Sequence, residues 1–399
     1  MKIGPGLNRT PLPQGFYASG INSGVRRYRP DVGVILSERP AVAAGVFTLN
    51  EYKAASVLYS QALCPADDIY AIITNSGQAN AATGPLGVMN NFKMAEAVAN
   101  ALGVRPQQVL TASTGAIGIQ MEIEKITAAI PELIHRKSVS AESFALAILT
   151  TDLLPKTVSV EVILEQGPIR LTGIAKGSGM IHPNMATMLG YFLTDLCLSK
   201  EEASLYLKKA TDKSFNMISV DGDCSTNDCC FLLANGASGI RLTSAKDHQA
   251  FAAALNEVSI FLAKSIARDG EGATKLIEVK LEGAPDLTLA RRAARGLITS
   301  SLVKTAIHGE DPNWGRILAS LGQHGVPAAL LNQMTLKLQN IVVFDAGAPR
   351  GVDLEEIRAQ LKYDTILIEI DLQAGPFTAT AWGCDLSKKY VEINAEYLT

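Results

Sequence analysis

The sequence is poor in several features that mark particular classes of protein. Charged residues make up only 19% of the 399 residues, the net charge is −3, and no stripe of basic residues stands out. Nucleic acid is therefore not expected as a partner. No apolar run reaches the roughly 18 residues that a membrane helix needs. The polar N-terminus MKIGPGLNRTPLPQG lacks the apolar region of a signal peptide, so we expect a cytoplasmic protein.

Cysteine is also scarce, with six residues in the whole chain. A cytoplasmic setting argues against disulfide bonds. Cys224, Cys229 and Cys230 cluster with Asp223 and Asp228, but the cluster contains neither a CxxC spacing nor a histidine. A metal site is therefore disfavoured. The better interpretation is that these cysteines are small buried residues on a strand and its turn.

The hydrophobic share of 47% and the length of the chain predict a globular protein of two or three domains. Apolar residues alternate at 158–164 and 366–372, which predicts strands. They recur with helical spacing at 92–102 and 251–266, and Gly270 follows the second run as a stop signal. Because no regular βαβ repeat appears, we expect a layered α/β (α+β) sandwich.

The C-terminal part carries its own boundary signals. The segment LEGAPD at 281–286 is typical of a linker, and a C-terminal unit is expected after it. Asp353 is placed to cap a helix in that unit. The final residues YVEINAEYLT predict a strand that docks the C-terminus and brings Asn394 or Thr399 to a site.

Glycine-rich turns recur in NSGQANAATG (75–84), STGAIG (113–118) and AKGSGM (175–180). Each turn can expose backbone N–H groups to an anion or an oxyanion. None matches GxxxxGK[ST], or GxGxxG between a strand and a helix, so nucleotide binding is poorly supported. Taken singly, such a turn is more often only a turn.

Thr187 stands between the third glycine-rich turn and an apolar run, in the sequence HPNMATMLGYF. A threonine hydroxyl becomes a good nucleophile when a base lies beside it, and an N-terminal threonine supplies that base as its own α-amino group. Thr187 would reach this state if its hydroxyl attacked the carbonyl of Ala186 and water then cut the resulting ester. From the residues alone, this hypothesis competes with an ordinary strand residue.

Eight motifs, in order along nearly the whole chain, closely resemble signatures of the ornithine acetyltransferase family. These are the bifunctional glutamate N-acetyltransferase/amino-acid acetyltransferases of arginine biosynthesis. The motifs are NSGQANAATG (75–84), STGAIG (113–118), TTD (150–152), KGSGMIHPNMATMLGYFLTD (176–195), SVDGDCSTND (219–228), RDGEGATK (268–275), GEDPNWGR (309–316) and NAEYLT (394–399).

The resemblance implies a self-cleaving acyltransferase with an N-terminal-nucleophile-like fold. Cleavage between Ala186 and Thr187 would give an α chain of residues 1–186 and a β chain of residues 187–399. Within the β chain, residues 187–282 would complete the catalytic core and 283–399 would form a smaller C-terminal α/β domain. The cleaved chains are expected to pair as an α2β2 heterotetramer.

The resemblance also implies a reaction. Acetyl would pass from N2-acetylornithine to glutamate through acetyl-Thr187, giving ornithine and N-acetylglutamate. No metal or bound cofactor is expected, and acetyl-CoA is expected as an additional acetyl donor. An amidohydrolase or aminopeptidase with the same type of nucleophile is the alternative.

Positions that match the family motifs give the expected site residues. Thr187 is the nucleophile, and Thr114 and Gly115 are the donors that stabilise the oxyanion. Lys176 suits the α-carboxylate of the substrate, and Glu271 either contacts the amine of ornithine or handles a proton. The full expected substrate-binding set is Thr151, Lys176, Thr187, Glu271, Asn394 and Thr399.

Three further interpretations stay open at this point. His182 either assists cleavage or is a hydrogen-bonded turn residue. His308, Asp311 and Arg316 form either a charged catalytic group or a buried structural network. Cys224 departs from the family pattern DGDTSTND, where a threonine is usual, so packing should survive while a hydroxyl hydrogen bond weakens.

Overall fold

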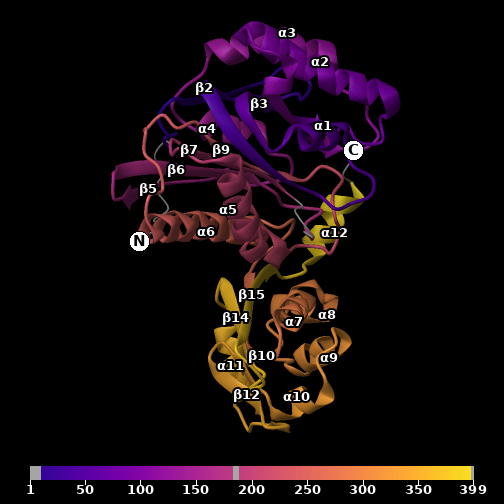
Figure 1. The fold of residues 1–399 in the computed structure, drawn as a ribbon. Helices are drawn as coiled ribbons and strands as arrows, with labels where there is room; N and C mark the ends of the chain where they lie inside the picture. Colours follow the sequence, from indigo (N-terminus) through magenta and orange to yellow (C-terminus); the bar gives the residue numbers. More distant parts are fainter. Residues whose placement is uncertain (1–9, 183–187, 397–399) are drawn as a thin grey trace. The chain divides into compact units, whose positions relative to one another are not determined.

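The computed structural model describes residues 10–182 and 188–396, which divide between two compact units. The chain passes between the units several times, so each unit is assembled from segments that are distant in the sequence (Figure 1). The first unit falls within Met1–Gly177, Pro183–Asn216 and Cys224–Leu262, and the second within Ser178–His182, Met217–Asp223 and Ala263–Thr399.

The first unit is built on an eight-stranded sheet in the order β4-β3-β2-β9-β7-β6-β5, with β1 paired to β2. β2 is 16 residues long, and its register against β3 shifts between Leu36 and Ala41. β1 pairs with the first part of β2 and β9 with its last part, so β2 carries the sheet from one half to the other. The strands are β1 (Phe16–Ile21), β2 (Val32–Phe47), β3 (Ala66–Gln78), β4 (Val109–Ala116), β5 (Lys156–Leu164), β6 (Gly167–Lys176), β7 (Leu189–Thr194) and β9 (Cys229–Ala234).

Apolar cores make this unit a sandwich of helix, sheet, sheet and helix layers. One core lies between the two halves of the sheet and includes Ile72, Tyr191 and Phe231. A second lies between the β1–β4 half and helices α2 and α3, around Met94 and Ile126. Helices α5 and α6 cover the other half, as Figure 1 shows. The helices are α1 (Ala55–Leu63), α2 (Gly84–Leu102), α3 (Ile123–His135), α4 (Glu142–Ala147), α5 (Lys200–Lys213) and α6 (Ala245–Arg268), which ends in the second unit.

Sequence periodicity accounts for the elements that line these cores. Val158, Val160 and Val162 alternate along β5 and are buried, as predicted. Phe251 and Leu255 lie on the buried face of α6, which ends two residues before Gly270, and this prediction is also confirmed. Among the described helices, α6 alone is long and apolar enough to cross a membrane, but half of that apolar stretch is buried, as in the core helix of a globular unit.

The second unit is built on a seven-stranded mixed sheet in the order β13-β12-β11-β14-β10-β15-β8. Helix α7 packs against β10 and β15, and α8 and α9 pack against α7. The expected layered α/β architecture with a smaller second α/β unit is confirmed. Its strands are β8 (Ile218–Ser219), β10 (Leu276–Ala284), β11 (Thr335–Leu338), β12 (Ile341–Asp345), β13 (Ala348–Pro349), β14 (Thr365–Asp371) and β15 (Phe377–Cys384). Its helices are α7 (Leu287–Thr299), α8 (Ser301–His308), α9 (Gly315–Gln323), α10 (Ala328–Gln333), α11 (Leu354–Gln360) and α12 (Lys388–Ala395).

The segment expected to be a linker is part of this fold. β10 runs to Ala284, and Asp286 then caps α7 by accepting the Leu289 N–H at 2.8 Å. β10 is hydrogen-bonded between β14 and β15, so residues 263–282 belong with the C-terminal unit and not with the first one. The expected division at 282/283 therefore differs from the division that the strand pairing produces.

Of the two expectations for the C-terminal part of the chain, one is confirmed and one is wrong. Asp353 caps α11 as predicted, since its Oδ1 accepts the Glu355 N–H at 2.9 Å. The strand expected at the end of the chain is wrong, because the described part of that segment forms α12. Lys389 and Glu392 pair at 3.0 Å across one turn of α12, a contact that a strand would not allow.

Candidate active site

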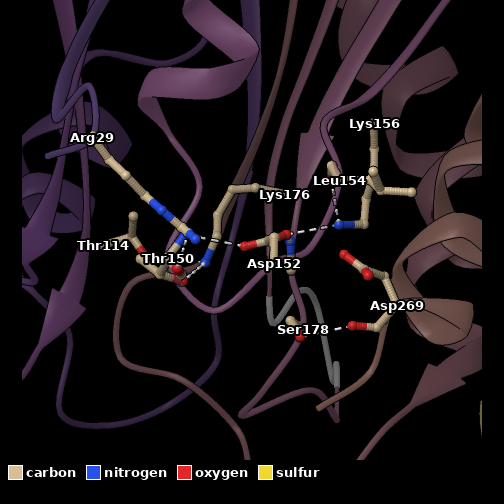
Figure 2. A network of polar contacts seen from close by, with 10 residues as sticks. Arg29, Thr114, Thr150, Asp152, Leu154, Lys156, Lys176, Ser178 and Asp269 are labelled. Atoms are coloured by element: carbon tan, nitrogen blue, oxygen red, sulfur yellow. Dashed lines mark hydrogen bonds and ion pairs between the residues drawn. The ribbon is translucent and has the colours of Figure 1, made fainter. Parts of the chain in front are cut away.

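Lys176, the last residue of β6, presents a buried ammonium group to two hydroxyls. Its Nζ donates to Thr114 Oγ1 at 3.1 Å and to Thr150 Oγ1 at 3.2 Å (Figure 2). Thr114 lies on β4 and Thr150 lies between α4 and β5. A hydroxyl that accepts a bond from an ammonium keeps its own hydrogen as a donor. Thr114 can therefore donate to a third group while Lys176 holds it.

Asp152 lies beside Lys176 and is completely buried. Its Oδ1 accepts from Lys156 Nζ at 2.8 Å and from the Gly177 N–H at 2.7 Å, and its Oδ2 accepts the Thr150 N–H at 3.2 Å (Figure 2). Burial by itself would raise the pKa of Asp152, but the charges of Lys176 and Lys156 and the hydrogen bonds from Lys156 and Gly177 lower it to about 2. The carboxylate is therefore ionised at neutral pH.

Gly115 occupies a position that only glycine fits. Its φ is +128°, and a Cβ there would overlap the carbonyl carbon of Gly77 and lie 2.6 Å from the Gln78 nitrogen. The close approach arises because β3 and β4 are parallel neighbours, with Gly77 paired to Gly115. This geometry lets the chain turn immediately after Thr114 and leaves no side chain over the Gly115 amide.

Asn227 and Asp228, just before β9, form hydrogen bonds with the backbone of other segments of the first unit. Asn227 Nδ2 donates to the carbonyls of Ser113 at 2.8 Å and Ala79 at 2.5 Å. Asp228 accepts the N–H of Met188, the residue that follows Thr187, while its Oδ2 has no hydrogen-bond partner in the described part of the chain. Burial raises the pKa of Asp228 well above its usual range, against the opposing effects of Ser225, Lys176 and the Met188 amide.

The second unit brings Glu271 and Asn394 together. Asn394 Nδ2 donates to Glu271 Oε2 at 2.7 Å, and the Glu271 side chain is 6% exposed. The Glu271 N–H donates to the Ser178 carbonyl at 3.2 Å. A Cβ on Gly179 would overlap the Glu271 carboxylate, so this approach requires glycine.

His182, also in the second unit, is held as a neutral imidazole. Arg295 Nη2 lies 3.0 Å from His182 Nε2, so Nε2 accepts, and Nδ1 donates to Ser219 Oγ at 3.2 Å. Ser219 Oγ in turn donates to the Ile181 carbonyl at 3.1 Å. Burial and the charge of Arg295 lower the pKa of His182 to about 4, in spite of Asp223. With its lone pair directed at Arg295, His182 is better suited to anchoring the turn than to taking a proton.

Comparison with known proteins identifies the family. The model of the ArgJ family matches residues 17–399. The chain belongs to the ArgJ family.

Curated ArgJ relatives match almost end to end. The arginine biosynthesis bifunctional protein ArgJ of Oceanobacillus iheyensis is 46% identical over 390 residues, which cover 97% of this chain and 95% of that protein. The ArgJ protein of Dehalococcoides mccartyi is 45% identical over 392 residues, covering 97% and 96% of the two chains. The crystal structure of ArgJ from Bacillus halodurans aligns with a TM-score of 0.51 and 41% identity, over 52% of this chain and 99% of that one. The resemblance stated from the motifs is confirmed at the level of the family.

The structure brings together some of the residues expected from the ArgJ motifs. Thr114, next to Gly115, bonds Lys176 in the first unit, and Glu271 bonds Asn394 in the second. The second hydroxyl that accepts from Lys176 belongs to Thr150, the neighbour of the expected Thr151. The expected residues Ala186, Thr187 and Thr399 lie outside the described residues.

Sequence reasoning missed four residues that hold this arrangement in place. Asp152 and Lys156 form a buried ion pair beside Lys176, Thr150 accepts from Lys176, and Asn227 holds the backbone before Thr114. Asp152 and Thr150 stand within the quoted motif TTD, and Asn227 within SVDGDCSTND, so the motifs carried a signal that residue type alone did not. Lys156 lies outside every quoted motif.

Two of the three clustered cysteines are buried strand residues. Cys229 and Cys230 are buried on β9, as predicted. The described residues contain no group of three or more His, Cys, Asp or Glu side chains suited to a metal ion. Cys224 Sγ lies 3.7 Å from Thr48 Oγ1, a longer contact than a hydroxyl at this position would make.

His308, the last residue of α8, and Arg316 on α9 each bond to partners of their own. His308 Nδ1 lies 2.7 Å from Asp385 Oδ2, and the Asp385 carboxylate also accepts from the loop before β10. Arg316 donates instead to the Leu302 carbonyl at 2.9 Å. His308 and Arg316 therefore bond different partners, which favours the structural interpretation over a charged catalytic group with Asp311.

Proposed function

We propose that this chain transfers an acetyl group from N2-acetylornithine to glutamate through an acetylated Thr187. The observation that carries the proposal is the buried Lys176 ammonium bonded to the Thr114 hydroxyl, one residue before Gly115. A cation, a hydroxyl donor and a backbone N–H are the groups that an acyl-transfer site needs for a substrate carboxylate and a developing oxyanion. Membership of the ArgJ family, whose matched relatives are named for arginine biosynthesis, supports the same reaction.

We further propose that the chain cuts itself between Ala186 and Thr187. Thr187 Oγ attacks the Ala186 carbonyl, the peptide C–N bond breaks as an ester forms, and water hydrolyses the ester to leave Thr187 with a free α-amine. The products are residues 1–186 and residues 187–399. One observation supports the cut: the crystallised Bacillus halodurans chain is matched over 99% of its length by only 52% of this chain, as expected of a protein divided near its middle.

The transfer itself proceeds in two steps. Thr187 Oγ attacks the acetyl carbonyl of N2-acetylornithine, and the α-amine of Thr187 takes the hydroxyl proton, as suits an α-amino group, whose ordinary pKa is about 8. Thr114 Oγ–H and Gly115 N–H donate to the oxyanion. The acetyl C–N bond then breaks, the proton moves to the leaving amine, and ornithine departs from the acetyl ester. The amine of glutamate attacks that ester, which gives N-acetylglutamate and regenerates Thr187.

Both substrates carry an α-carboxylate, and we assign Lys176 to bind it. The Lys176 side chain is 7% exposed, so its charge acts with little screening by water. Glu271 and Asn394, which already bond each other, are proposed to contact the amine-bearing end of ornithine. Thr151 and Thr399 complete the proposed substrate-binding set.

The wider properties follow from the same proposal. The chemistry needs no bound cofactor or metal, and acetyl-CoA is proposed as a second acetyl donor to Thr187 for net synthesis of N-acetylglutamate. The cleaved chains are proposed to assemble as α2β2 in the cytoplasm. All six cysteines are free thiols, which is compatible with a reducing compartment.

Intact-mass analysis of the purified full chain tests both proposals. The wild-type protein should appear as two polypeptides. After incubation with N2-acetylornithine alone, the polypeptide that begins at Thr187 should gain one acetyl group, which added glutamate should remove. Thr187→Ala should remain a single polypeptide of 42.4 kDa and show no transfer.

Two results would overturn these assignments. A wild-type protein that stays uncut while it transfers acetyl would remove self-cleavage from the mechanism. Release of free acetate in place of N-acetylglutamate would mean that water resolves the acyl-enzyme, as in an amidohydrolase. Incubation with acetyl-CoA and glutamate, without acetylornithine, tests the second donor separately.

A further inference from the structure

Asp152 and Lys156 form an ion pair that is almost fully removed from solvent. The Lys156 Nζ to Asp152 Oδ1 distance is 2.8 Å, and the two side chains are 3% and 0% exposed. The Gly177 and Thr150 N–H groups also donate to the Asp152 carboxylate. Backbone bonds therefore fix where this negative charge lies, whichever cation accompanies it.

Lys176 is a second cation near the same carboxylate. The charge of Lys176 acts on Asp152, yet the ammonium of Lys176 donates to the hydroxyls of Thr114 and Thr150. In a buried setting a carboxylate attracts an ammonium more strongly than a hydroxyl does. The position of Lys176 is thus compatible with Lys156 already compensating much of the Asp152 charge.

A second acid, Asp228, also interacts electrostatically with Lys176. Burial raises the pKa of Asp228 well above its usual range, which weakens its competition with Asp152 for Lys176. Lys156 and Lys176 both act electrostatically on the Asp152 carboxylate. Buried cations stabilise an anionic ligand that comes within their reach.

We propose that Lys156 is a charge-balancing residue, which by pairing with Asp152 leaves the charge of Lys176 available for the α-carboxylate of each substrate. The inference rests on the carboxylate-binding role proposed above for Lys176. Lys156 acts through Lys176 and does not touch the substrate, because its own ammonium is held by Asp152 and by the Leu154 carbonyl at 3.2 Å. Without Lys156, the charge of Asp152 would act on Lys176 alone and draw it away from the substrate.

A pair of substrates that differ only at the carboxylate tests this role. N2-acetylornithine and N2-acetylornithinamide, in which a neutral amide replaces the α-carboxylate, are compared by kcat/KM, and the ratio of the two values is the carboxylate preference. Wild-type protein should prefer the acid. Lys156→Met should lower the preference about 10- to 100-fold, mainly through KM for the acid, since a charge-assisted contact is lost. A purely structural role would lower both kcat/KM values equally and leave the preference unchanged.

A double variant keeps the proposal testable if Lys156→Met does not fold. Asp152→Asn with Lys156→Met removes both buried charges together, a change that proteins tolerate better than loss of one partner. It should keep the preference within about threefold of wild type, because Asp152 then no longer competes for Lys176. Lys264→Met is the matched control, since Lys264 pairs with Glu278 at 2.7 Å in the second unit, and it should leave both KM values unchanged.

Each outcome has a distinct meaning. An unchanged preference in Lys156→Met, or loss of the preference in the double variant, would overturn the charge-balancing role. Lys176→Met separates this inference from the proposed function, because it should abolish the preference whatever Lys156 does. If Lys176→Met retains the preference, the carboxylate assignment itself is wrong. If it loses the preference while Lys156→Met keeps it, only the present inference fails.

Discussion

Replacing Gly115 with alanine should lower both the stability of the protein and its rate of acetyl transfer. The backbone geometry around Gly115 gives the size of the stability loss. The residue has φ of +128°, where a side chain costs about 1–3 kcal/mol. The new Cβ would also lie 2.5 Å from the Gly77 oxygen and 2.6 Å from the Gln78 nitrogen. Both atoms belong to the backbone of a buried strand, and overpacking of this kind costs about a further 1–3 kcal/mol. We expect Gly115→Ala to lose about 2–6 kcal/mol of stability.

The same substitution should slow acetyl transfer, because relief of the overlap must move the Gly115 amide or its neighbour Thr114. Loss of one oxyanion donor lowers the rate about 100- to 1,000-fold. Thermal unfolding and single-turnover transfer from N2-acetylornithine measure the two effects separately. Gly118→Ala is the matched control within the same motif, since its φ is +82° but nothing lies within 4 Å of the added Cβ. It should cost about 1 kcal/mol and leave the transfer rate within a few-fold of wild type.

Either of two results would refute this reasoning. If Gly115→Ala unfolds at the same temperature as Gly118→Ala, the close approach to Gly77 is not a constraint on the fold. If Gly115→Ala is destabilised but transfers acetyl at the wild-type rate, the Gly115 amide is not an oxyanion donor.

Three further predictions follow from single contacts. Asn227→Ala removes the hydrogen-bond donor of the buried Ser113 and Ala79 carbonyls. It should therefore lower the free energy of unfolding in urea by about 2–5 kcal/mol. A loss below about 1 kcal/mol would contradict the role given to Asn227. Cys224→Thr should gain about 0.5–1 kcal/mol in the same assay, since a hydroxyl bonds Thr48 better than a thiol does, and a loss of stability would count against it. His182 has a pKa of about 4 in the fold and about 6.5 when unfolded, so the unfolded state binds the proton first as the pH falls. Wild-type protein should therefore lose thermal stability relative to His182→Gln between about pH 6.5 and 4. Above pH 7 the difference in unfolding temperature between the two proteins should not change with pH. A difference that stays constant over the whole pH range would refute this assignment.

Local sequence patterns predicted those strands and helices whose buried face follows from the spacing of apolar residues within a single segment. The alternation of Val158, Val160 and Val162 matches one face of β5, and the spacing of Phe251 and Leu255 matches one face of α6. Motif likeness supplied Thr114, Lys176, Glu271 and Asn394, and the structure groups these into two bonded pairs. Spacing alone would have found neither pair, because the partners are 62 and 123 residues apart.

The residues that were missed owe their role to pairing between distant strands. Lys156 and Ala175 are cross-strand partners on β5 and β6, which places Lys156 near Asp152 and Gly177. No composition or periodicity marks that position, since a lysine at the start of a strand is usually solvated. The last helix was missed for a related reason, because short apolar alternation in YVEINAEYLT fits a strand as well as an exposed helix.

Strand ends explain why the first unit collects its chemistry in one place. Thr114 and Gly115 stand near the carboxyl end of β4, which is parallel to β3, and ligands of α/β sheets bind at such ends. β6 ends at Lys176, whose partner on antiparallel β7 is Leu189, the first residue of that strand. β9 runs parallel to β7 and starts with Cys229 opposite the same Leu189.

The ends of β4 and β6 and the starts of β7 and β9 therefore lie around the amide of Met188, whose N–H donates to Asp228. Beyond these ends the ladder no longer uses the backbone groups, so N–H groups such as those of Gly177 and Met188 bond carboxylates instead. Substitutions in the middle of β4 or β6 should act on stability through the core. Substitutions of Thr114, Gly115 or Lys176, near the ends of these strands, should act on catalysis, because there the side chains and backbone donors face groups other than the next strand.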